Sequence, residues 1–355
     1  MLHYNTIPES PTQVHVEITP YCNLACGFCP VHKMQRGSPL TRDQILDVLA
    51  QACDAHPEYL DFVNYNEPLT CRDFWTYAAV VTSRLGHGHL GVVTNGTHMS
   101  EEIAFRLISL GLRQLVFSID AVSAETYAKV RPRHTPDGPR EDLEIRDLVY
   151  RNVDLYIDCL RRAGSSAWPV VQMTVCDTNA HEVDAFLAYW RQKPVSQALA
   201  LNCTGRGGER PYTVPNDVPC RAILDGLWVL SDGRVVACCE DWDALDPVGN
   251  VREESLSRIW NGPRIRAFRE AHFAGRKRDI KVCAACQTSQ DTGDHNLYPR
   301  NTRREVLVEL GARGVGPLAR KLEETESPAA RVAPSVDGSD GAGAPAPPTV
   351  PTSST

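Results

Sequence analysis

The chain has 355 residues, of which 42% are hydrophobic and 23% charged, a composition typical of a globular protein with about two domains. Its 37 basic and 44 acidic residues leave a net charge of −7, which argues against nucleic-acid binding through a broad basic surface. The sequence has no apolar run long enough to span a membrane and no secretory signal. We therefore expect a cytoplasmic protein with no membrane partner.

Strand-like and helix-like stretches alternate over the first two hundred residues. The sequence predicts strands at 13–19, 59–63, 90–94, 114–119, 170–176 and 198–202. It predicts helices at 41–56, 72–85, 100–110, 124–130, 143–163 and 182–192. Thr41 and Ser100 are the expected N-caps of two of these helices. Alternating strands and helices favour a parallel sheet with right-handed crossovers. Since six units fall short of a closed eight-stranded barrel, we predict an α/β fold, a partial (β/α)6 TIM-like barrel.

The composition changes after residue 202, where glycine and proline residues accumulate and indicate a loop. Two apolar stretches flank Ser231-Asp232-Gly233 and predict a β-hairpin, and further helices are predicted at 255–274 and 303–324. The last segment has several prolines and no aromatic residue, so we expect it to be disordered. The expected parts are an N-terminal extension (1–12), the partial barrel (13–203), a small unit with the hairpin and a helix (204–300), a C-terminal helix (301–326) and the tail (327–355).

Cysteine is unusually frequent, with 13 residues, and its spacing points to metal rather than to disulfides, which are rare in a reducing compartment. Cys22, Cys26 and Cys29 form a C-x3-C-x2-C pattern just after the first predicted strand. Three thiolates can bind three irons of a cubane cluster and leave the fourth iron open. A structural zinc site needs a fourth ligand, and none lies at zinc-finger spacing.

A second group of four cysteines lies in the C-terminal half of the chain. They suit a fully ligated iron–sulfur cluster, and they also suit structural zinc. We prefer Cys238 over its neighbour Cys239 because it follows Gly233 at a Gly-x4-Cys interval, although the exchange of the two stays open. The predicted ligands of this second group are Cys220, Cys238, Cys283 and Cys286.

The first cysteine group, with Phe28 directly before Cys29, resembles the signature of the radical S-adenosylmethionine (SAM) enzymes. The resemblance implies a 4Fe–4S cluster whose open iron binds SAM, and a 5′-deoxyadenosyl radical that abstracts a hydrogen atom from the substrate. Residues 64–68 stand where the family has a Gly-Gly-Glu-Pro-like segment, but both glycines are replaced here. By resemblance, the residues that contact SAM are Phe28, Asn66, Glu67, Thr94, Asn95, Ser118, Asp120 and Arg131. An arginine fork suits the SAM carboxylate, which the resemblance gives to Ser118 and Arg131.

The second cysteine group resembles the auxiliary-cluster domain called twitch, a short form of the SPASM domain. This resemblance implies one auxiliary 4Fe–4S cluster held entirely by protein, and therefore two clusters in all. The arrangement is similar to that of butirosin-type dehydrogenases of aminocyclitols and sugars in antibiotic pathways. It implies two-electron oxidation of an alcohol, with a flavodoxin- or ferredoxin-type protein as electron donor.

Other functions remain open from the sequence alone. Radical decarboxylation or epimerisation of a sugar or nucleoside-sugar acid, as in the blasticidin pathway, uses similar iron–sulfur clusters and SAM, so the clusters do not fix the reaction. Modification of a ribosomal peptide ranks lower, because few residues precede the first strand to form a peptide-binding unit. A non-enzymatic binding module stabilised by zinc is a further alternative, and it would contain no sulfide.

The expected substrate is a small sugar, aminocyclitol or nucleoside, and its contacts are predicted from strand parity. His15 and Glu17 share one face of the first strand, and polar residues repeated inside a barrel indicate a polar substrate, unless that face is solvated. The thiol of Cys203, at the end of the last barrel strand, could donate a hydrogen atom to a substrate radical. The candidate substrate contacts are His15, Glu17, Asn64, Gln172 and Arg210, and the candidate catalytic residues are Cys203 and Arg206.

Overall fold

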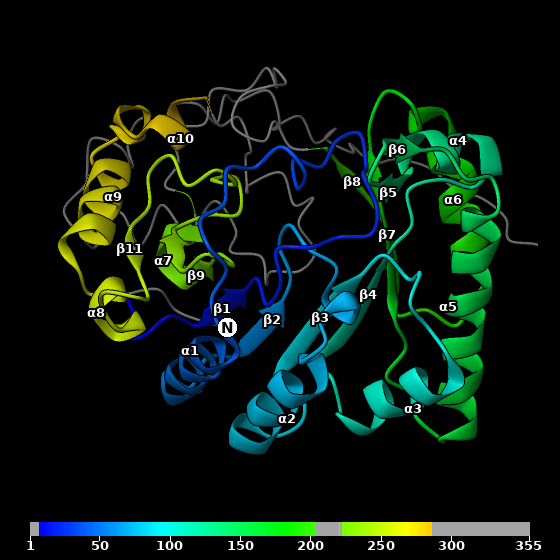
Figure 1. Ribbon diagram of the computed structural model, residues 1–355, viewed down its shortest axis with the longest axis horizontal. Helices are drawn as coiled ribbons and strands as arrows, with labels where there is room; N and C mark the ends of the chain where they lie inside the picture. Colours follow the sequence, from blue (N-terminus) through cyan, green and yellow to red (C-terminus); the bar gives the residue numbers. More distant parts are fainter. Residues whose placement is uncertain (1–6, 204–219, 221, 286–355) are drawn as a thin grey trace, which may run out of the picture.

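The computed structural model describes residues 7–203, 220 and 222–285, and these residues build one nine-stranded sheet with helices packed on it (Figure 1). The strand order is β11-β10-β9-β1-β2-β3-β4-β7-β8. The six barrel strands are β1 (Gln13–Val16), β2 (Tyr59–Phe62), β3 (Leu90–Thr94), β4 (Gln114–Ser118), β7 (Val170–Val175) and β8 (Gln197–Asn202). Each pairs with its neighbour in parallel, so the predicted partial barrel is confirmed.

The helices between the barrel strands cover one face of the sheet (Figure 1). They are α1 (Arg42–Asp54), α2 (Phe74–Leu85), α3 (Glu101–Ser109), α4 (Ala124–Val130), α5 (Ile145–Arg162) and α6 (Val183–Trp190). Thr41 caps α1 in a capping box with Gln44, and the Ser100 hydroxyl accepts a hydrogen bond from the backbone of Ile103 in α3. The two predicted N-caps are therefore confirmed.

The core lies between the sheet and these helices. Alternate strand residues such as Leu60, Val92 and Phe117 point into it and are at most 1% exposed. Burial of one such side chain stabilises the fold by about 1.5–3 kcal/mol. The other strand residues face the barrel interior, so the alternation of the sequence decides which side chains can reach a ligand.

The part of the chain after the barrel adds three strands to the same sheet. They are β9 (Gly226–Val229), β10 (Arg234–Val236) and β11 (Gly249–Asn250). The hairpin β9–β10 stands where the sequence predicts it, and β9 pairs in parallel with β1 over four residues. The loop with Cys22, Cys26 and Cys29 follows β1, and Cys238 follows β10, so one segment from each cysteine group extends from this sheet.

Short helices surround this hairpin, and one prediction about them is wrong. The helices are α7 (Ala222–Asp225), α8 (Leu256–Trp260), α9 (Pro263–Phe273) and α10 (Lys281–Ala285), and the 3-10 helices of the chain are η1 (Pro68–Thr70), η2 (Ala180–Glu182) and η3 (Lys277–Asp279). The predicted single helix 255–274 is two helices. Gly262 is extended, with φ −75° and ψ 167°, and Pro263 opens α9 because its ring suits the first helical position.

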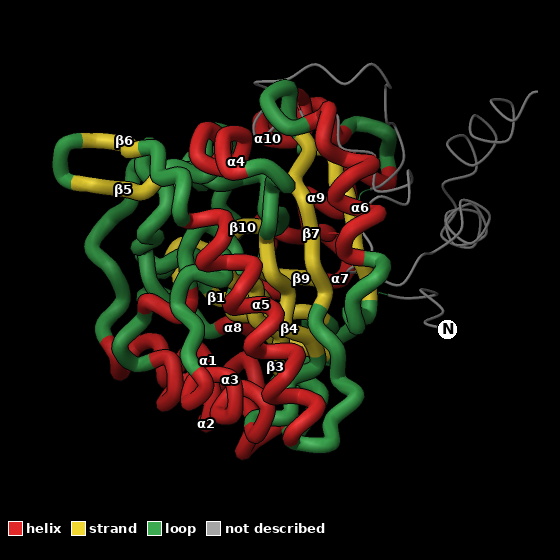
Figure 2. Tube along the Cα trace, turned by 90° about the vertical axis from the view of Figure 1, so that its right-hand side faces the viewer, coloured by secondary structure: helices red, strands yellow, loops and turns green. Residues whose placement is uncertain are grey.

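A small hairpin was not predicted from the sequence. It consists of β5 (Arg133–Thr135) and β6 (Gly138–Arg140), and it projects from the side of the molecule (Figure 2). None of the helices in the described ranges combines the length and apolarity that crossing a bilayer requires. The predicted helix 303–324, the tail, Arg206, Arg210 and Cys286 lie outside the described residues.

Candidate active site

The loop with the first three cysteines follows β1 and is held by the segment after α4. The backbone N–H of Ala25 donates to the carbonyl of Pro132 at 2.8 Å, and that of Gly27 donates to the carbonyl of Val130 at 3.2 Å. Arg131 lies between these two acceptors in the sequence. The fold therefore brings the cysteine loop and Arg131 together, as the family resemblance implies.

A turn at the end of β3 contacts the same loop. The Nδ2 atom of Asn95 donates to the Oδ1 atom of Asn23 at 2.8 Å and lies 3.9 Å from the sulfur of Cys22. The Oδ1 atom of Asn95 accepts hydrogen bonds from the backbone and hydroxyl of Thr97. Asn95 is therefore fixed beside the first cysteine, while Asn23 is a neighbour that sequence reasoning missed.

Glu67 joins the loop after β2 to the turn after β3. Its carboxylate is 1% exposed and accepts hydrogen bonds from the Thr94 hydroxyl at 2.7 Å, the Asn95 backbone at 2.6 Å and the Leu69 backbone at 3.1 Å. Burial raises the pKa of Glu67 to about 7, against the lowering effect of these hydrogen bonds. Glu67 thus ties together two segments that carry predicted SAM contacts.

Arg131 and Asp120 form a buried ion pair at the end of β4. The Nε atom of Arg131 lies 2.6 Å from the Oδ2 atom of Asp120, and the other oxygen of Asp120 accepts from the backbone of Thr174 at 2.6 Å. Ser118 accepts a hydrogen bond from the Nε2 atom of Gln172 at 3.1 Å. The predicted carboxylate contacts Ser118 and Arg131 therefore both lie at the carboxyl end of the sheet, where α/β folds bind ligands.

Buried polar atoms around this pocket fit a polar ligand such as SAM. In the described part of the chain, neither polar atom of the Asn66 amide has a hydrogen-bond partner, and the same is true of the Nδ2 atom of Asn64 and the Oε1 atom of Gln172. Buried amide groups are normally paired, so a bound molecule is the natural source of partners. Asn64 also adopts φ 113°, a strained angle of the kind that clusters at functional sites.

The chemistry of the first cysteine group fits a cluster. Within the described ranges, no three His, Cys, Asp or Glu side chains converge closely enough to hold a single metal ion. Ligands of a cubane bind different iron atoms and stand farther apart than ligands of one ion. Burial raises the pKa of the Cys22 thiol, so cluster binding would have to displace its proton.

Cys203 lies near the expected adenine site. It is 3% exposed, and it packs with Phe28, Val130 and Cys176 in one small apolar cluster. Phe28 is the aromatic residue that the family resemblance places against adenine. The thiol that we considered as a hydrogen-atom donor is thus close to the predicted SAM contact.

The polar face of β1 is buried, so the alternative of a solvated strand face is wrong. His15 stacks on Trp228 of β9 with ring centroids 4.5 Å apart, and its Nδ1 atom lies 3.4 Å from the carboxylate of Asp61. His15 and Glu17 are 3% and 1% exposed. Both face the barrel interior, where the sequence predicts substrate contacts.

Glu17 binds three segments of the protein at once. Its carboxylate accepts hydrogen bonds from Arg36 at 3.2 Å, from the backbone of Tyr65 at 3.2 Å and from the backbone of Ser231 at 2.8 Å. Burial raises the pKa of Glu17 in spite of the Arg36 charge. The carboxylate that we predicted as a substrate contact therefore also fixes the C-terminal hairpin to the barrel.

Cysteines of the C-terminal half lie near Trp228. Cys220, Cys238 and Cys239 pack against the small apolar cluster that contains Trp228. Hydrogen bonding to the Cys239 side chain, together with burial, raises the pKa of the Cys238 thiol, so the two adjacent thiols are in contact. The Tyr65 hydroxyl donates to the carbonyl of Cys239 at 2.6 Å. The loop of Glu67 therefore touches the segment of the second cysteine group.

His272 connects two of the predicted auxiliary ligands. Its Nδ1 atom accepts from the backbone of Cys220 at 3.1 Å, and its Nε2 atom lies 3.4 Å from the sulfur of Cys283. Burial lowers the pKa of His272 to about 4, and the nearby charge of Lys277 acts in the same direction. Sequence reasoning missed both His272 and Trp228, because neither lies in a motif.

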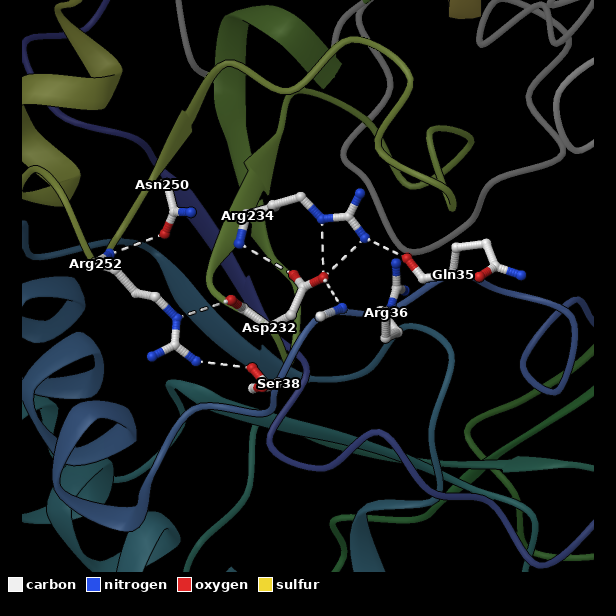
Figure 3. A pocket seen from close by; sticks show the side chains of 8 residues that line it. Gln35, Arg36, Ser38, Asp232, Arg234, Asn250 and Arg252 are labelled. Carbon is white, nitrogen blue, oxygen red and sulfur yellow. Dashed lines mark hydrogen bonds and ion pairs between the residues drawn. The ribbon is translucent and has the colours of Figure 1, made fainter.

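A pocket of about 430 Å³ lies between the segment 35–38 and residues of the C-terminal strands and their turn (Figure 3). Its labelled side chains are Gln35, Arg36, Ser38, Asp232, Arg234, Asn250 and Arg252. Arg234 donates to the carboxylate of Asp232 at 2.9 Å, and Arg252 donates to the carbonyls of Asp232 and Ser38. These contacts attach the segment after the cysteines to the turn of the β9–β10 hairpin.

Comparison with known families matches both halves of this site. Residues 16–187 match the radical SAM superfamily, and residues 220–287 match the SPASM iron–sulfur cluster-binding domain. The two matched ranges contain the two cysteine groups. The second range also contains His272 and Trp228.

Several known proteins resemble the chain. The S-adenosyl-L-methionine-dependent 2-deoxy-scyllo-inosamine dehydrogenase of Niallia circulans is 21% identical over 282 residues, which are 78% of this chain and 92% of that protein. The crystal structure of BtrN in complex with AdoMet and 2-DOIA is 18% identical, with a TM-score of 0.53, and covers 78% of this chain and 93% of its own. The structure of anSMEcpe with AdoMet and a peptide is 15% identical, with a TM-score of 0.56 over 88% of this chain and 99% of its own. At these identities the structural likeness shows the shared fold.

Proposed function

The chain is a radical SAM enzyme with a SPASM iron–sulfur domain, and from that premise we propose that it oxidises an alcohol of an aminocyclitol or related sugar to a carbonyl. Its cofactors are SAM and 4Fe–4S clusters, one of them auxiliary. The similar Niallia circulans protein is named as a dehydrogenase of 2-deoxy-scyllo-inosamine, which supports this substrate class. The reaction belongs to antibiotic or related natural-product biosynthesis.

The contact between Tyr65 and Cys239 carries the proposal. Tyr65 stands where the family has a glycine, next to Asn66 and Glu67 of the candidate SAM pocket, and its hydroxyl donates to the Cys239 carbonyl at 2.6 Å. A group bound at Cys238 would therefore stand close to the loop with Asn66 and Glu67, which are predicted to contact SAM. That closeness favours removal of a second electron over a redox-neutral outcome.

We assign the two clusters to the two cysteine groups. Cys22, Cys26 and Cys29 would hold the cluster that binds SAM, and the auxiliary ligands would be Cys220, Cys238, Cys283 and Cys286. When bound, SAM and its cluster supply a radical that abstracts a hydrogen atom, and the auxiliary cluster supplies an acceptor for one electron. In total the alcohol loses a hydrogen atom from carbon, a proton from oxygen and one electron, which leaves a carbonyl.

The side chains of this chain would bind and orient the reactants. Arg131, held by Asp120, and Ser118 would bind the SAM carboxylate, since a guanidinium suits that group. Asn66 and Gln172 have buried polar atoms that bound molecules would satisfy. His15, next to Asp61, would contact the polar substrate from β1.

The electron source and the compartment belong to the proposal as well. A flavodoxin- or ferredoxin-type protein would supply the electron that starts SAM cleavage. We place the protein in the cytoplasm, where thiols stay reduced. Arg206 and Arg210, outside the described residues, remain candidates for binding the substrate hydroxyls.

The first test measures iron, sulfide and SAM cleavage after anaerobic reconstitution. We expect about eight irons per chain, the content of two cubanes, and formation of 5′-deoxyadenosine. Replacement of Cys22, Cys26 and Cys29 by alanine should leave about four irons and abolish cleavage. Cys159→Ala, in a buried cysteine of α5 outside both groups, is the control and should keep both properties. Full cleavage in the triple variant would contradict the assignment.

The second test addresses the reaction. With 2-deoxy-scyllo-inosamine deuterated at its carbinol carbons as the probe, deuterium should appear in 5′-deoxyadenosine and a ketone should form. Cys283→Ala should lose one cluster and the ketone while deuterium transfer continues. Recovery of an epimer, or release of carbon dioxide from a sugar acid, would contradict the proposed oxidation. The corresponding redox-neutral reaction would then be the function of the protein.

A further inference from the structure

A buried histidine lies between two segments of the auxiliary cysteine group. His272 belongs to α9 and is 1% exposed. Its Nδ1 atom lies 3.1 Å from the backbone nitrogen of Cys220, and its Nε2 atom lies 3.4 Å from the sulfur of Cys283. One imidazole ring therefore connects two predicted ligands that are far apart in the sequence.

The proton position on this ring follows from its neighbours. A backbone N–H can only donate, so the Nδ1 atom that faces Cys220 must accept and carries no proton. In a neutral imidazole the proton then resides on the Nε2 atom. The Nε2–H bond consequently faces the sulfur of Cys283. A thiolate sulfur has no proton, so it can act only as the acceptor of this hydrogen bond.

The helix that carries His272 is held firmly. Arg269, one turn earlier in α9, donates from its Nε atom to the carbonyl of Ile223 at 3.0 Å and from Nη1 to the carbonyl of Trp260 at 3.1 Å. The same guanidinium lies 4.0 Å over the Trp260 ring. These contacts fix α9 against α7 and α8, so His272 keeps its place between the two cysteines.

We propose that His272 is a positioning residue that donates an Nε2–H···S hydrogen bond to Cys283 and thereby raises the reduction potential of the auxiliary cluster. The inference rests on the proposed function, in which Cys220 and Cys283 are ligands of that cluster. A hydrogen bond to a ligating sulfur withdraws electron density and stabilises the reduced, more negative cluster. The effect favours transfer of the second substrate electron to this cluster.

Two substitutions separate the two ends of the ring. In His272→Asn the side-chain oxygen can still accept from the Cys220 backbone, but nothing reaches the sulfur of Cys283. In His272→Gln the amide nitrogen reaches about as far as Nε2 and restores a donor. The comparison therefore tests the N–H···S bond apart from the packing of α9.

The readout is the reduction of the auxiliary cluster, followed by EPR in full-length protein with both clusters loaded. SAM perturbs the signal of the first cluster and so distinguishes it from the auxiliary one. In His272→Asn we expect the reduced-to-oxidised ratio of the auxiliary cluster at a fixed ambient potential to fall about three- to tenfold, the size of one hydrogen bond. His272→Gln should stay close to the unmodified protein. Equal ratios in all three proteins would overturn the inference.

A second measurement needs no substitution and therefore stands even if a variant fails to load its cluster. In unmodified protein with 15N-labelled histidine, pulsed EPR of the reduced auxiliary cluster should show a histidine 15N coupling, and absence of this coupling would overturn the inference. Cys283→Ala distinguishes a failure of the proposed ligand set from a failure of the role of His272. If that variant keeps the auxiliary cluster, the proposed ligand set fails. If it loses the cluster but no histidine coupling exists, only the role of His272 fails.

Discussion

Glu67 shows how much a single residue can organise in this protein. Its buried carboxylate accepts hydrogen bonds from a hydroxyl and two backbone N–H groups on two different loops. All three groups are donors, so only an acceptor fits among them. The sequence predicts Glu67 as part of the pocket, but it does not show these partners.

We expect Glu67→Gln to destabilise the protein by about 1–3 kcal/mol, because its amide group would face the Asn95 or Leu69 backbone donor and leave it unsatisfied. The free energy of unfolding, measured by anaerobic chemical denaturation, checks this. Glu102→Gln on the exposed side of α3 is the control and should change stability by less than about 0.5 kcal/mol. Equal stability of the two variants would contradict the network.

The buried pair of Arg131 and Asp120 leads to a second residue-scale prediction. Asp120→Ala would leave an uncompensated buried guanidinium, at a cost of about 3–5 kcal/mol. Denaturation of the variant should show this loss, whereas Asp158→Ala, which breaks the exposed pair with Arg161, should cost less than about 1 kcal/mol. SAM affinity should fall in the first variant alone, since Arg131 would no longer be oriented.

At the scale of elements, local patterns predicted the barrel well. The strands and helices up to β8 stand within a few residues of their predicted bounds, because alternating apolar residues and N-caps are local signals. The β5–β6 hairpin has no such signal. The predicted single helix 255–274 is interrupted at Gly262, and Pro263 opens the second helix.

The break between α8 and α9 can be tested directly. A Cβ atom at Gly262 would lie 2.8 Å from the carbonyl oxygen of Arg258 and 3.1 Å from that of Ile259. Gly262→Ala should therefore cost about 1–3 kcal/mol through backbone crowding. Ser257→Ala on the exposed side of α8 should stay within about 0.5 kcal/mol. A thermal melt of both variants with loaded clusters decides between these outcomes.

At the scale of the whole molecule, the cysteine groups were predictable but their relation was not. C-x3-C-x2-C and C-x2-C are spacings within one segment. The contact of Tyr65 with Cys239 joins residues 174 positions apart, and the stacking of His15 on Trp228 joins two strands that only the sheet order brings together. A single sequence contains no record of such pairings.

Substitution of Arg36 tests how the barrel and the C-terminal hairpin are held together. Its ion pair with Glu17 lies where the barrel meets the C-terminal hairpin, and Glu17 is almost fully buried. Arg36→Met should cost about 3 kcal/mol, because a buried carboxylate loses its counter-charge. Arg84→Met removes an exposed partner of Asp54 and should cost less than about 1 kcal/mol. Similar losses in both variants would show that the buried pair does not hold the hairpin.

The pairing of β9 with β1 has a consequence for any attempt to divide the protein. Because β9 covers one side of β1, a fragment that ends at residue 203 would expose the N–H and C=O groups of β1 along a bare edge. Exposed edges of this kind recruit strands from other molecules and lead to aggregation. The boundary between the two family matches in the sequence is therefore no boundary for folding, because β9 supplies the strand that pairs with the free side of β1.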